Sequence, residues 1–378
     1  EPVYKRLNSI HEHMTEGRYD EALKDLAKLE KVPLKKYEEA LVLQTYGFAY
    51  VQQAMYKQAQ DYIERCLAME ALPGTATLGM LYSLASLYLA DSEYEKAIAT
   101  MRRWFRYEEE PVADAYMVIA SAFSEMQQFG AALPYVRKAI ELADEPNEGW
   151  YKLELAIYFD AERYRDAAVL LRKMVRLWPD KPEHWDVLVA AYIELKEDKN
   201  ALDAMMVAYA KGHITSESKL KALAQLNMLL EIPFAAGQIM EKAIADGSME
   251  ASQENLDILL QAWLSAKEYD RATAAIERLG PLADDGEYFM QEAGIHNERG
   301  EWAKVPPAVE KAIEMGLDEP TPAYMLAGMA YTELRQFDAA LAAFRNARRL
   351  GDTKQRSNAS AWIEFVEDKV AVQRAALN

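Results

Sequence analysis

Apolar residues recur along the whole chain at spacings of three and four positions, which is the pattern of amphipathic helices. A small residue recurs at a longer period, and an aromatic residue stands three positions before it in most cases, as Tyr19 does before Ala22. We call this small residue the anchor. Successive anchors lie 33 to 38 positions apart, and they are Ala22, Ala59, Ala97, Ala132, Ala167, Ala201, Ala236, Ala272, Val305 and Ala340. Ten hits near a period of 34 predict an array of helical repeats.

A second small or apolar residue lies twelve positions before most anchors, and a ring follows it three positions later, as in Gly328 and Tyr331. Small residues let two helices approach closely, so this pattern predicts that each repeat is a helix hairpin. The rings then fill the groove against the next repeat. Prolines at the predicted repeat junctions, where a helix must stop, are Pro73, Pro111, Pro146, Pro179 and Pro320.

Two segments carry this pattern most fully. One has Trp185, Leu188, Tyr192, Ala201 and Ala208, and the other has Tyr324, Gly328, Tyr331, Ala340, Phe344 and Ala347. These residues resemble the tetratricopeptide repeat (TPR). The resemblance implies an all-α, right-handed superhelical solenoid of about ten helix-turn-helix repeats, with residues 1–354 forming one continuous domain. Residues 355–378 then form a capping helix, because a terminal repeat would otherwise leave an apolar face in water.

Composition narrows the function classes. The 378 residues include 51% hydrophobic and 28% charged residues, which is typical of a folded chain rather than a disordered one. A net charge of −18 argues against nucleic acid as a partner, because phosphate contacts need clustered Lys and Arg. Residues 71–90 carry no charge, but Pro73, Gly74 and several Ser and Thr residues interrupt them, so we expect no membrane span.

The sequence contains no pattern that indicates catalysis, a metal site or a cofactor. His11 and His13 are two positions apart and point to different faces of a helix, so they cannot share one metal ion. The carboxylates of 108–110 and of Asp284 and Asp285 are predicted to lie in loops between helices. The single cysteine, Cys66, excludes an internal disulfide and occupies a packing position, so we expect an inert thiol. We therefore expect no enzyme.

The TPR resemblance implies that a partner polypeptide lies in the concave groove, along the first helices of the repeats. In repeats 2 to 4 that surface is almost uncharged. Exposed apolar side chains in one groove would form a binding patch. The patch predicted here consists of Phe48, Val51, Tyr82, Leu89 and Met117. The alternative is that the longer second and third repeats pack tightly and bury these residues.

A carboxylate recurs seven positions before five of the anchors, near the end of the first helix. These residues are Glu125, Asp160, Glu194, Glu298 and Glu333. In a stacked array they predict an acidic stripe that attracts a Lys- or Arg-rich segment. Acidic side chains at a helix C-terminus oppose the helix dipole and cost some stability, which favours a functional role. The alternative is that they only keep the helix ends soluble.

The second half of the chain has a narrower resemblance. Residues 200–209, 223–230, 243–247 and 359–363 look like parts of the TPR proteins that accompany bacterial TonB energy-transduction systems. That resemblance implies a periplasmic protein whose partner carries Lys/Pro-rich, TonB-like segments or is another envelope protein. The chain starts at Glu1 without a Met, which agrees with removal of a leader.

The expected function is a non-enzymatic scaffold that binds a partner polypeptide in its concave groove, within a TonB-type system of the cell envelope. One alternative is a cytoplasmic regulatory or assembly adaptor. Another is a non-catalytic subunit of a machine for envelope glycan synthesis or export. The sequence leaves the oligomeric state open.

Overall fold

The computed structural model describes residues 2–283 and 286–377. Within these ranges the chain contains helices and no strand, which confirms the predicted all-α class. The chain forms two compact units, Glu1–Leu195 and Lys196–Asn378, and each is described by itself. The boundary falls inside the sixth predicted repeat, between its two helices.

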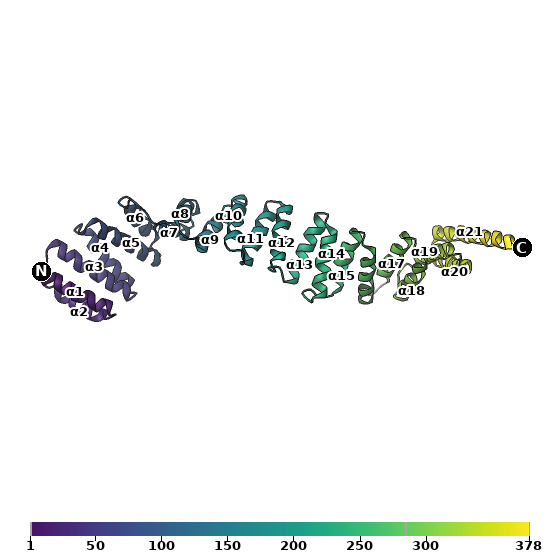
Figure 1. Cartoon of the computed structure of the whole chain (residues 1–378), viewed down its shortest axis with the longest axis horizontal. Coiled ribbons are helices and arrows are strands. Elements are labelled where there is room, and N and C mark those ends of the chain that lie inside the picture. Colours follow the sequence, from purple (N-terminus) through teal and green to yellow (C-terminus); the bar gives the residue numbers. More distant parts are fainter. Residues whose placement is uncertain (1, 284–285, 378) are drawn as a thin grey trace. The chain divides into compact units, whose positions relative to one another are not determined.

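The first unit consists of eleven consecutive helices, which alternate between the first and the second helix of a repeat (Figure 1). They are α1 (Pro2–Thr15), α2 (Tyr19–Leu29), α3 (Lys36–Gln52), α4 (Tyr56–Ala68), α5 (Gly74–Ala90), α6 (Tyr94–Trp104), α7 (Ala113–Glu125), α8 (Phe129–Leu142), α9 (Glu148–Asp160), α10 (Tyr164–Leu177) and α11 (Pro182–Glu194).

The second unit continues the same alternation over its described residues. Its α-helices are α12 (Asp198–Ala210), α13 (Glu217–Leu229), α14 (Pro233–Ala245), α15 (Gln253–Ser265), α16 (Tyr269–Leu279), α17 (Glu287–Glu298), α18 (Val305–Glu314), α19 (Pro320–Glu333), α20 (Phe337–Leu350) and α21 (Thr353–Leu377). Short 3-10 turns, Gly280–Leu282 and Trp302–Lys304, precede α17 and α18.

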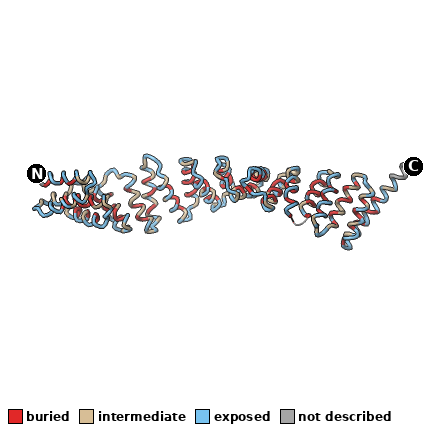
Figure 2. The backbone as a smooth tube through the Cα atoms, turned by 90° about the horizontal axis from the view of Figure 1, so that it is seen from below, coloured by how far each residue is buried: buried red, intermediate tan, exposed pale blue. Residues whose placement is uncertain are grey.

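The anchors explain why these helices pair. All ten anchors have no exposed surface, and each lies in the second helix of its repeat. The small residues of the first helices also permit close approach: a Cβ on Gly47 would lie 2.6 Å from Ile63 Cγ1, and one on Gly328 would lie 2.6 Å from Phe344 Cε1. Figure 2 shows buried residues recurring on one side of each helix, with exposed residues along the other side.

A left-handed residue separates the two helices of every repeat. It lies five positions before the anchor, with φ between 52° and 76°, and only two of the ten are glycine. In the fifth repeat Glu162 has φ 52°, and the N–H of Arg163 donates to the carbonyl of Tyr158 at 2.8 Å. This is the Schellman arrangement, which satisfies carbonyl groups at the end of the first helix and reverses the chain. The ten turn residues are Gly17, Ala54, Ser92, Gln127, Glu162, Lys196, Glu231, Lys267, Gly300 and Arg335.

The first helices of the second and third repeats are one turn longer than most others. Helices α3 and α5 each have 17 residues, whereas α7 and α9 have 13. The extra residues lie at the N-terminal end, at Gly74–Thr77 in α5. They account for the two longest anchor spacings in the sequence.

The last helix, α21, begins at Thr353, slightly before the predicted position 355. Its side chains Ala359, Ile363 and Val366 are buried, and the ring of Trp362 stacks on Phe344 of α20 with centroids 5.4 Å apart. Phe344 itself has no exposed surface. The helix therefore covers the apolar face of α20.

Candidate partner-binding surface

The five predicted acidic residues occupy one position in the repeat. Each is the last residue of a first helix: Glu125 ends α7, Asp160 ends α9 and Glu194 ends α11 in the first unit. Glu298 ends α17 and Glu333 ends α19 in the second unit. All five side chains are exposed. The left-handed turn begins directly after them, so the fold holds each carboxylate at a helix end.

These carboxylates have no cationic partner among the residues that the structure describes. Among the described residues, none of the five forms an ion pair within 4.0 Å, although the chain has ion pairs elsewhere, such as Lys221 with Glu254 at 3.0 Å. A carboxylate at a helix C-terminus faces the negative end of the helix dipole, which costs roughly 0.3–1 kcal/mol at an exposed position. Each residue therefore stays available to a cation from outside the chain.

The predicted apolar patch is only partly accessible. Phe48 of α3 is 37% exposed. The other four side chains, Val51, Tyr82, Leu89 and Met117, are half-buried and pack against the core of the first unit. The ring of Tyr82 lies 6.0 Å from that of Trp104, between centroids. The structure thus leaves one partly exposed ring, Phe48, and a wall of four half-buried apolar side chains.

The polar groups of this wall are partly satisfied by the helix itself. The hydroxyl of Ser83 donates to the carbonyl of Gly79 at 2.9 Å, and that of Ser86 donates to the carbonyl of Tyr82 at 3.0 Å. Burial raises the pKa of the Tyr82 phenol, and the Asp114 carboxylate raises it further. The wall therefore stays uncharged over the physiological pH range.

Sequence comparison identifies the repeat. The tetratricopeptide repeat model matches residues 113–146, in the first unit, and residues 321–350, in the second. The chain contains tetratricopeptide repeats. The matched segments are the hairpin α7–α8 and most of the hairpin α19–α20, which carry Glu125 and Glu333. No curated protein matches the chain significantly.

Several solved structures resemble the chain at low identity. MamA of AMB-1 is 22% identical, with a TM-score of 0.39, over 47% of this chain and 92% of MamA. YrrB, described as a TPR protein with an unusual peptide-binding site, is 15% identical, with a TM-score of 0.38, over 45% of this chain and 84% of YrrB. A TPR protein from Parabacteroides merdae ATCC 43184 is 15% identical, with a TM-score of 0.31, over 68% of this chain and 98% of that protein.

Sequence reasoning singled out the position directly before the acidic one in repeats 2 and 3, as Val51 and Leu89, but missed its members Phe159 and Ile193. Ile193, next to Glu194, is 53% exposed, and Phe159, next to Asp160, is half-buried. The signal was present, because this position holds an apolar residue in repeats 1, 2, 3, 5, 6, 7 and 8. The ends of α9 and α11 therefore each present an apolar side chain beside a free carboxylate.

The turn of the seventh repeat also differs from the others. Leu229 takes the place of the acidic residue and is 66% exposed, and Ile232 and Phe234 nearby are exposed as well. The Phe234 ring meets Trp263 edge to face, with centroids 5.6 Å apart. In this repeat Pro233 stands where most repeats have an aromatic residue, three positions before the anchor.

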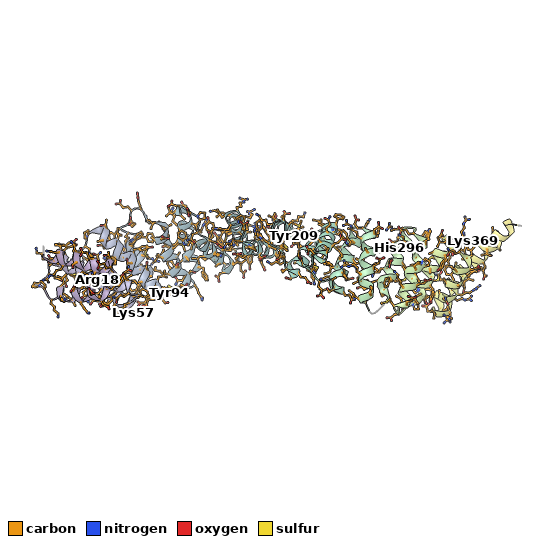
Figure 3. The ribbon with its side chains drawn as sticks, turned by 60° about the horizontal axis from the view of Figure 1, so that its bottom comes forward. Arg18, Lys57, Tyr94, Tyr209, His296 and Lys369 are labelled. Carbon is orange, nitrogen blue, oxygen red and sulfur yellow. The ribbon has the colours of Figure 1, made fainter. Side chains whose placement is uncertain are left out.

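Two ionisable side chains of the core, His296 and Cys66, are buried and have partners within the chain. His296, labelled in Figure 3, is buried in α17, with Nδ1 2.8 Å from Glu301 Oε2 and Nε2 3.6 Å from Glu292 Oε1. Burial raises the pKa of the Cys66 thiol to about 11, and its Sγ donates to the carbonyl of Ala40 at 3.2 Å. A thiol of this kind is a poor nucleophile at neutral pH.

Two further features of the described residues concern the requirements of a metal site and of a membrane-spanning helix. No group of three or more His, Cys, Asp or Glu side chains could hold a metal ion among the residues that the structure describes. Within the same residues, no helix has the length and hydrophobicity that crossing a membrane requires. Asp284 and Asp285 lie outside the described residues.

Proposed function

We propose that this chain is a non-enzymatic scaffold that holds an extended, basic segment of a partner protein along the ends of α7, α9 and α11. The observation that carries the proposal is the set of exposed, unpaired carboxylates Glu125, Asp160 and Glu194 at one repeat position. TPR folds are typical of proteins that bind peptides or proteins. The apolar side chains of Phe159 and Ile193 add contact area beside two of the carboxylates.

Electrostatics favour a cationic partner. A Lys or Arg from the partner would pair with a carboxylate and also meet the negative end of a helix dipole, so two favourable terms act on one charge. The net charge of −18 would accelerate the approach of a basic segment at low ionic strength. A Lys/Pro-rich segment fits this chemistry, because it is extended and cannot neutralise its own charges.

A charge-reversal experiment tests the proposal. The triple variant Glu125→Lys, Asp160→Lys and Glu194→Lys is compared with the wild type for binding a peptide of alternating Lys and Pro, by isothermal titration calorimetry. We expect at least a tenfold loss of affinity, since each lost pair is worth roughly 0.5–1 kcal/mol at an exposed site and each new Lys repels the peptide. Circular dichroism should be unchanged.

The matched control changes the net charge equally at exposed loop positions. The variant Glu109→Lys, Asp144→Lys and Glu145→Lys should keep most of the affinity. Equal losses in both variants would mean that only the overall charge attracts the peptide, and the proposed surface would then be wrong.

We further propose that the protein works in the bacterial periplasm with a TonB-type system or another envelope complex. The resemblance of residues 200–209 and 223–230 supports this location. Osmotic-shock fractionation of the native host, with an antibody against the protein, would test it. Recovery with a cytosolic marker enzyme would favour the cytoplasmic adaptor instead. Co-purification with glycan-synthesis or export proteins would favour the remaining alternative.

A further inference from the structure

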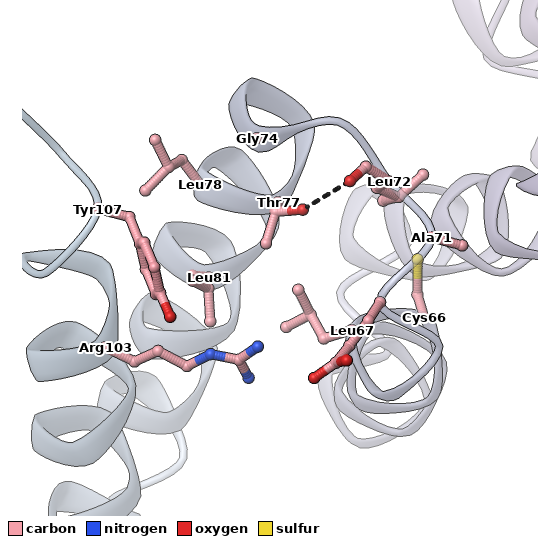
Figure 4. Close-up of a pocket in the computed structure, with 11 residues that line it drawn as sticks. Cys66, Leu67, Ala71, Leu72, Gly74, Thr77, Leu78, Leu81, Arg103 and Tyr107 are labelled. Atoms are coloured by element: carbon pink, nitrogen blue, oxygen red, sulfur yellow. Dashed lines mark hydrogen bonds between the residues drawn. The ribbon is translucent and has the colours of Figure 1, made fainter.

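A pocket of about 420 Å³ lies between the second and third repeats (Figure 4). The end of α4, the first turns of α5 and the end of α6 form its walls. Gly74 and Thr77, which line it, belong to the extra turn that lengthens α5. The extra turn, which gives the long spacing between the anchors Ala59 and Ala97, therefore supplies part of the pocket wall.

The inside of the pocket is apolar. Leu67 and Leu81 are buried at its base, and Leu72 and Leu78 are half-buried at its sides. The volume lies in the range of roughly 300–1,000 Å³ that is typical of sites for small ligands. The hydroxyl of Thr77 donates to the Leu72 carbonyl at 3.3 Å, so its hydrogen is already used within the chain. The pocket can therefore hold one large apolar side chain.

Two opposite charges line the same pocket without pairing. Arg103 comes from the last turn of α6 and is half-buried, and Glu70 comes from the loop after α4. Among the described residues, neither forms an ion pair within 4.0 Å or a side-chain hydrogen bond. Figure 4 shows the Arg103 guanidinium extending into the space in front of Leu81, with the Tyr107 ring beside it. A half-buried guanidinium without a partner is an available binding group for a carboxylate.

We propose that this pocket binds the C-terminal residue of a polypeptide that ends in a bulky apolar side chain. The side chain fills the space between Leu67, Leu78 and Leu81. The terminal carboxylate accepts from Arg103, and the N–H of the same residue donates to Glu70. The C-terminal residue of a polypeptide combines an apolar side chain, a carboxylate that accepts hydrogen bonds and an N–H that donates one. These three groups match the leucines, Arg103 and Glu70 of the pocket.

This site is independent of the acidic surface. Its residues lie on the edge of the repeats where a second helix ends and the next first helix begins, and none of them is Glu125, Asp160 or Glu194. Loss of binding at one surface therefore leaves the other intact.

The test uses the full chain and the peptide Gly-Ser-Gly-Ser-Phe, measured by isothermal titration calorimetry. We expect saturable one-to-one binding, with Kd below about 1 mM. The same peptide with a C-terminal amide should bind at least tenfold more weakly, because it lacks the anion that Arg103 recognises. Free phenylalanine serves as a third probe, and binding as tight as that of the peptide would overturn the assignment to a polypeptide.

Two pairs of variants locate the site. Arg103→Gln should lower the affinity at least tenfold, whereas Arg106→Gln, an exposed neighbour outside the pocket, should leave it unchanged. Gly74→Trp should block binding, since a Cβ there meets no atom within 4 Å and the larger ring can occupy the pocket. Gly79→Trp, an equally open glycine of α5 outside the pocket, should not.

Several results would overturn the proposal. They are no saturable binding of the free-acid peptide to the wild type, equal affinity for the acid and the amide, and equal effects within either pair of variants. If Arg103→Gln fails to fold, the pair of glycine variants decides the same question, because both substitutions start from open positions on one helix.

Discussion

At the scale of single residues, the repeats depend on a turn position that glycine rarely occupies. Eight of the ten left-handed turn residues carry a side chain, among them Glu162 with φ 52°. A side chain in this conformation costs roughly 1–2 kcal/mol, and part of that cost is recovered because glycine is more flexible when unfolded. The Schellman hydrogen bonds and the buried anchors must outweigh this cost in every repeat.

This balance predicts opposite effects at two equivalent turns. Glu162→Gly should stabilise the first unit by about 0.5–1 kcal/mol, because it removes the strained side-chain contact. Gly17→Ala should destabilise it by about 1 kcal/mol, since a Cβ at φ 76° is strained even though no atom lies within 4 Å. Urea denaturation measures both. The same sign for the two variants would show that turn strain is not the cause.

A buried histidine makes the first unit sensitive to acid. Burial lowers the pKa of His184, and this effect outweighs the carboxylate of Glu148, whose Oε1 lies 3.3 Å from Nε2. Glu183 also raises this pKa, while Lys152 and Lys181 lower it. Because the folded state holds the proton less tightly than the unfolded state, stability falls as the pH drops below about 6.5.

Replacing His184 should therefore make the free energy of unfolding depend less on pH. We expect the free energy of unfolding of His184→Phe to fall less between pH 7 and pH 5 than that of the wild type, whatever the effect on stability at pH 7. His11→Phe is the control, since His11 is exposed. If the free energy of unfolding falls equally for His184→Phe and the wild type, His184 is not the cause of the acid sensitivity.

At the scale of helices, α21 is needed to bury the end of the second unit. Trp362→Ala should destabilise that unit by about 3–5 kcal/mol, because the substitution uncovers the Phe344 ring and leaves a space in the core. Phe365→Ala, on the same helix, should cost about 1 kcal/mol or less, since Phe365 is 46% exposed. Thermal unfolding followed by circular dichroism distinguishes the two.

The sequence was sufficient to predict the helix pairs and much of their register. An anchor such as Ala272 is fully buried between two helices, so a small or β-branched residue recurs there and its spacing can be seen in the sequence. The left-handed turns were not predicted, because residues such as Lys267 and Arg335 carry no composition signal for a positive φ. Backbone hydrogen bonds determine that geometry, and any exposed residue can occupy it.

The candidate surface was predicted unevenly for a related reason. Glu125 and Asp160 could be placed at exposed helix ends, because the anchor register fixes the end of each helix. The burial of Tyr82 depends on contact with Trp104, which comes from another helix and has no sequence pattern of its own. The pocket beside Arg103 also needs three helices to form, so spacing alone could not reveal it.

At the scale of the whole molecule, repeat arrays transmit changes only between neighbours. The variant Trp362→Ala should therefore accelerate amide hydrogen exchange in α19, α20 and α21 and leave α1 to α4 unchanged. Mass spectrometry of peptic fragments measures this. Faster exchange along the full length would mean that the two units unfold as one.

Cys66 gives the molecule a practical property. It is the sole thiol of the chain, and it is only 1% exposed. Its Sγ donates to the carbonyl of Ala40 in the preceding helix. Maleimide dyes react with accessible thiolates, so they should leave it unmodified in the native state. A cysteine introduced beside either binding surface could thus carry a single fluorophore without replacement of the native one, and partner capture could be followed one molecule at a time.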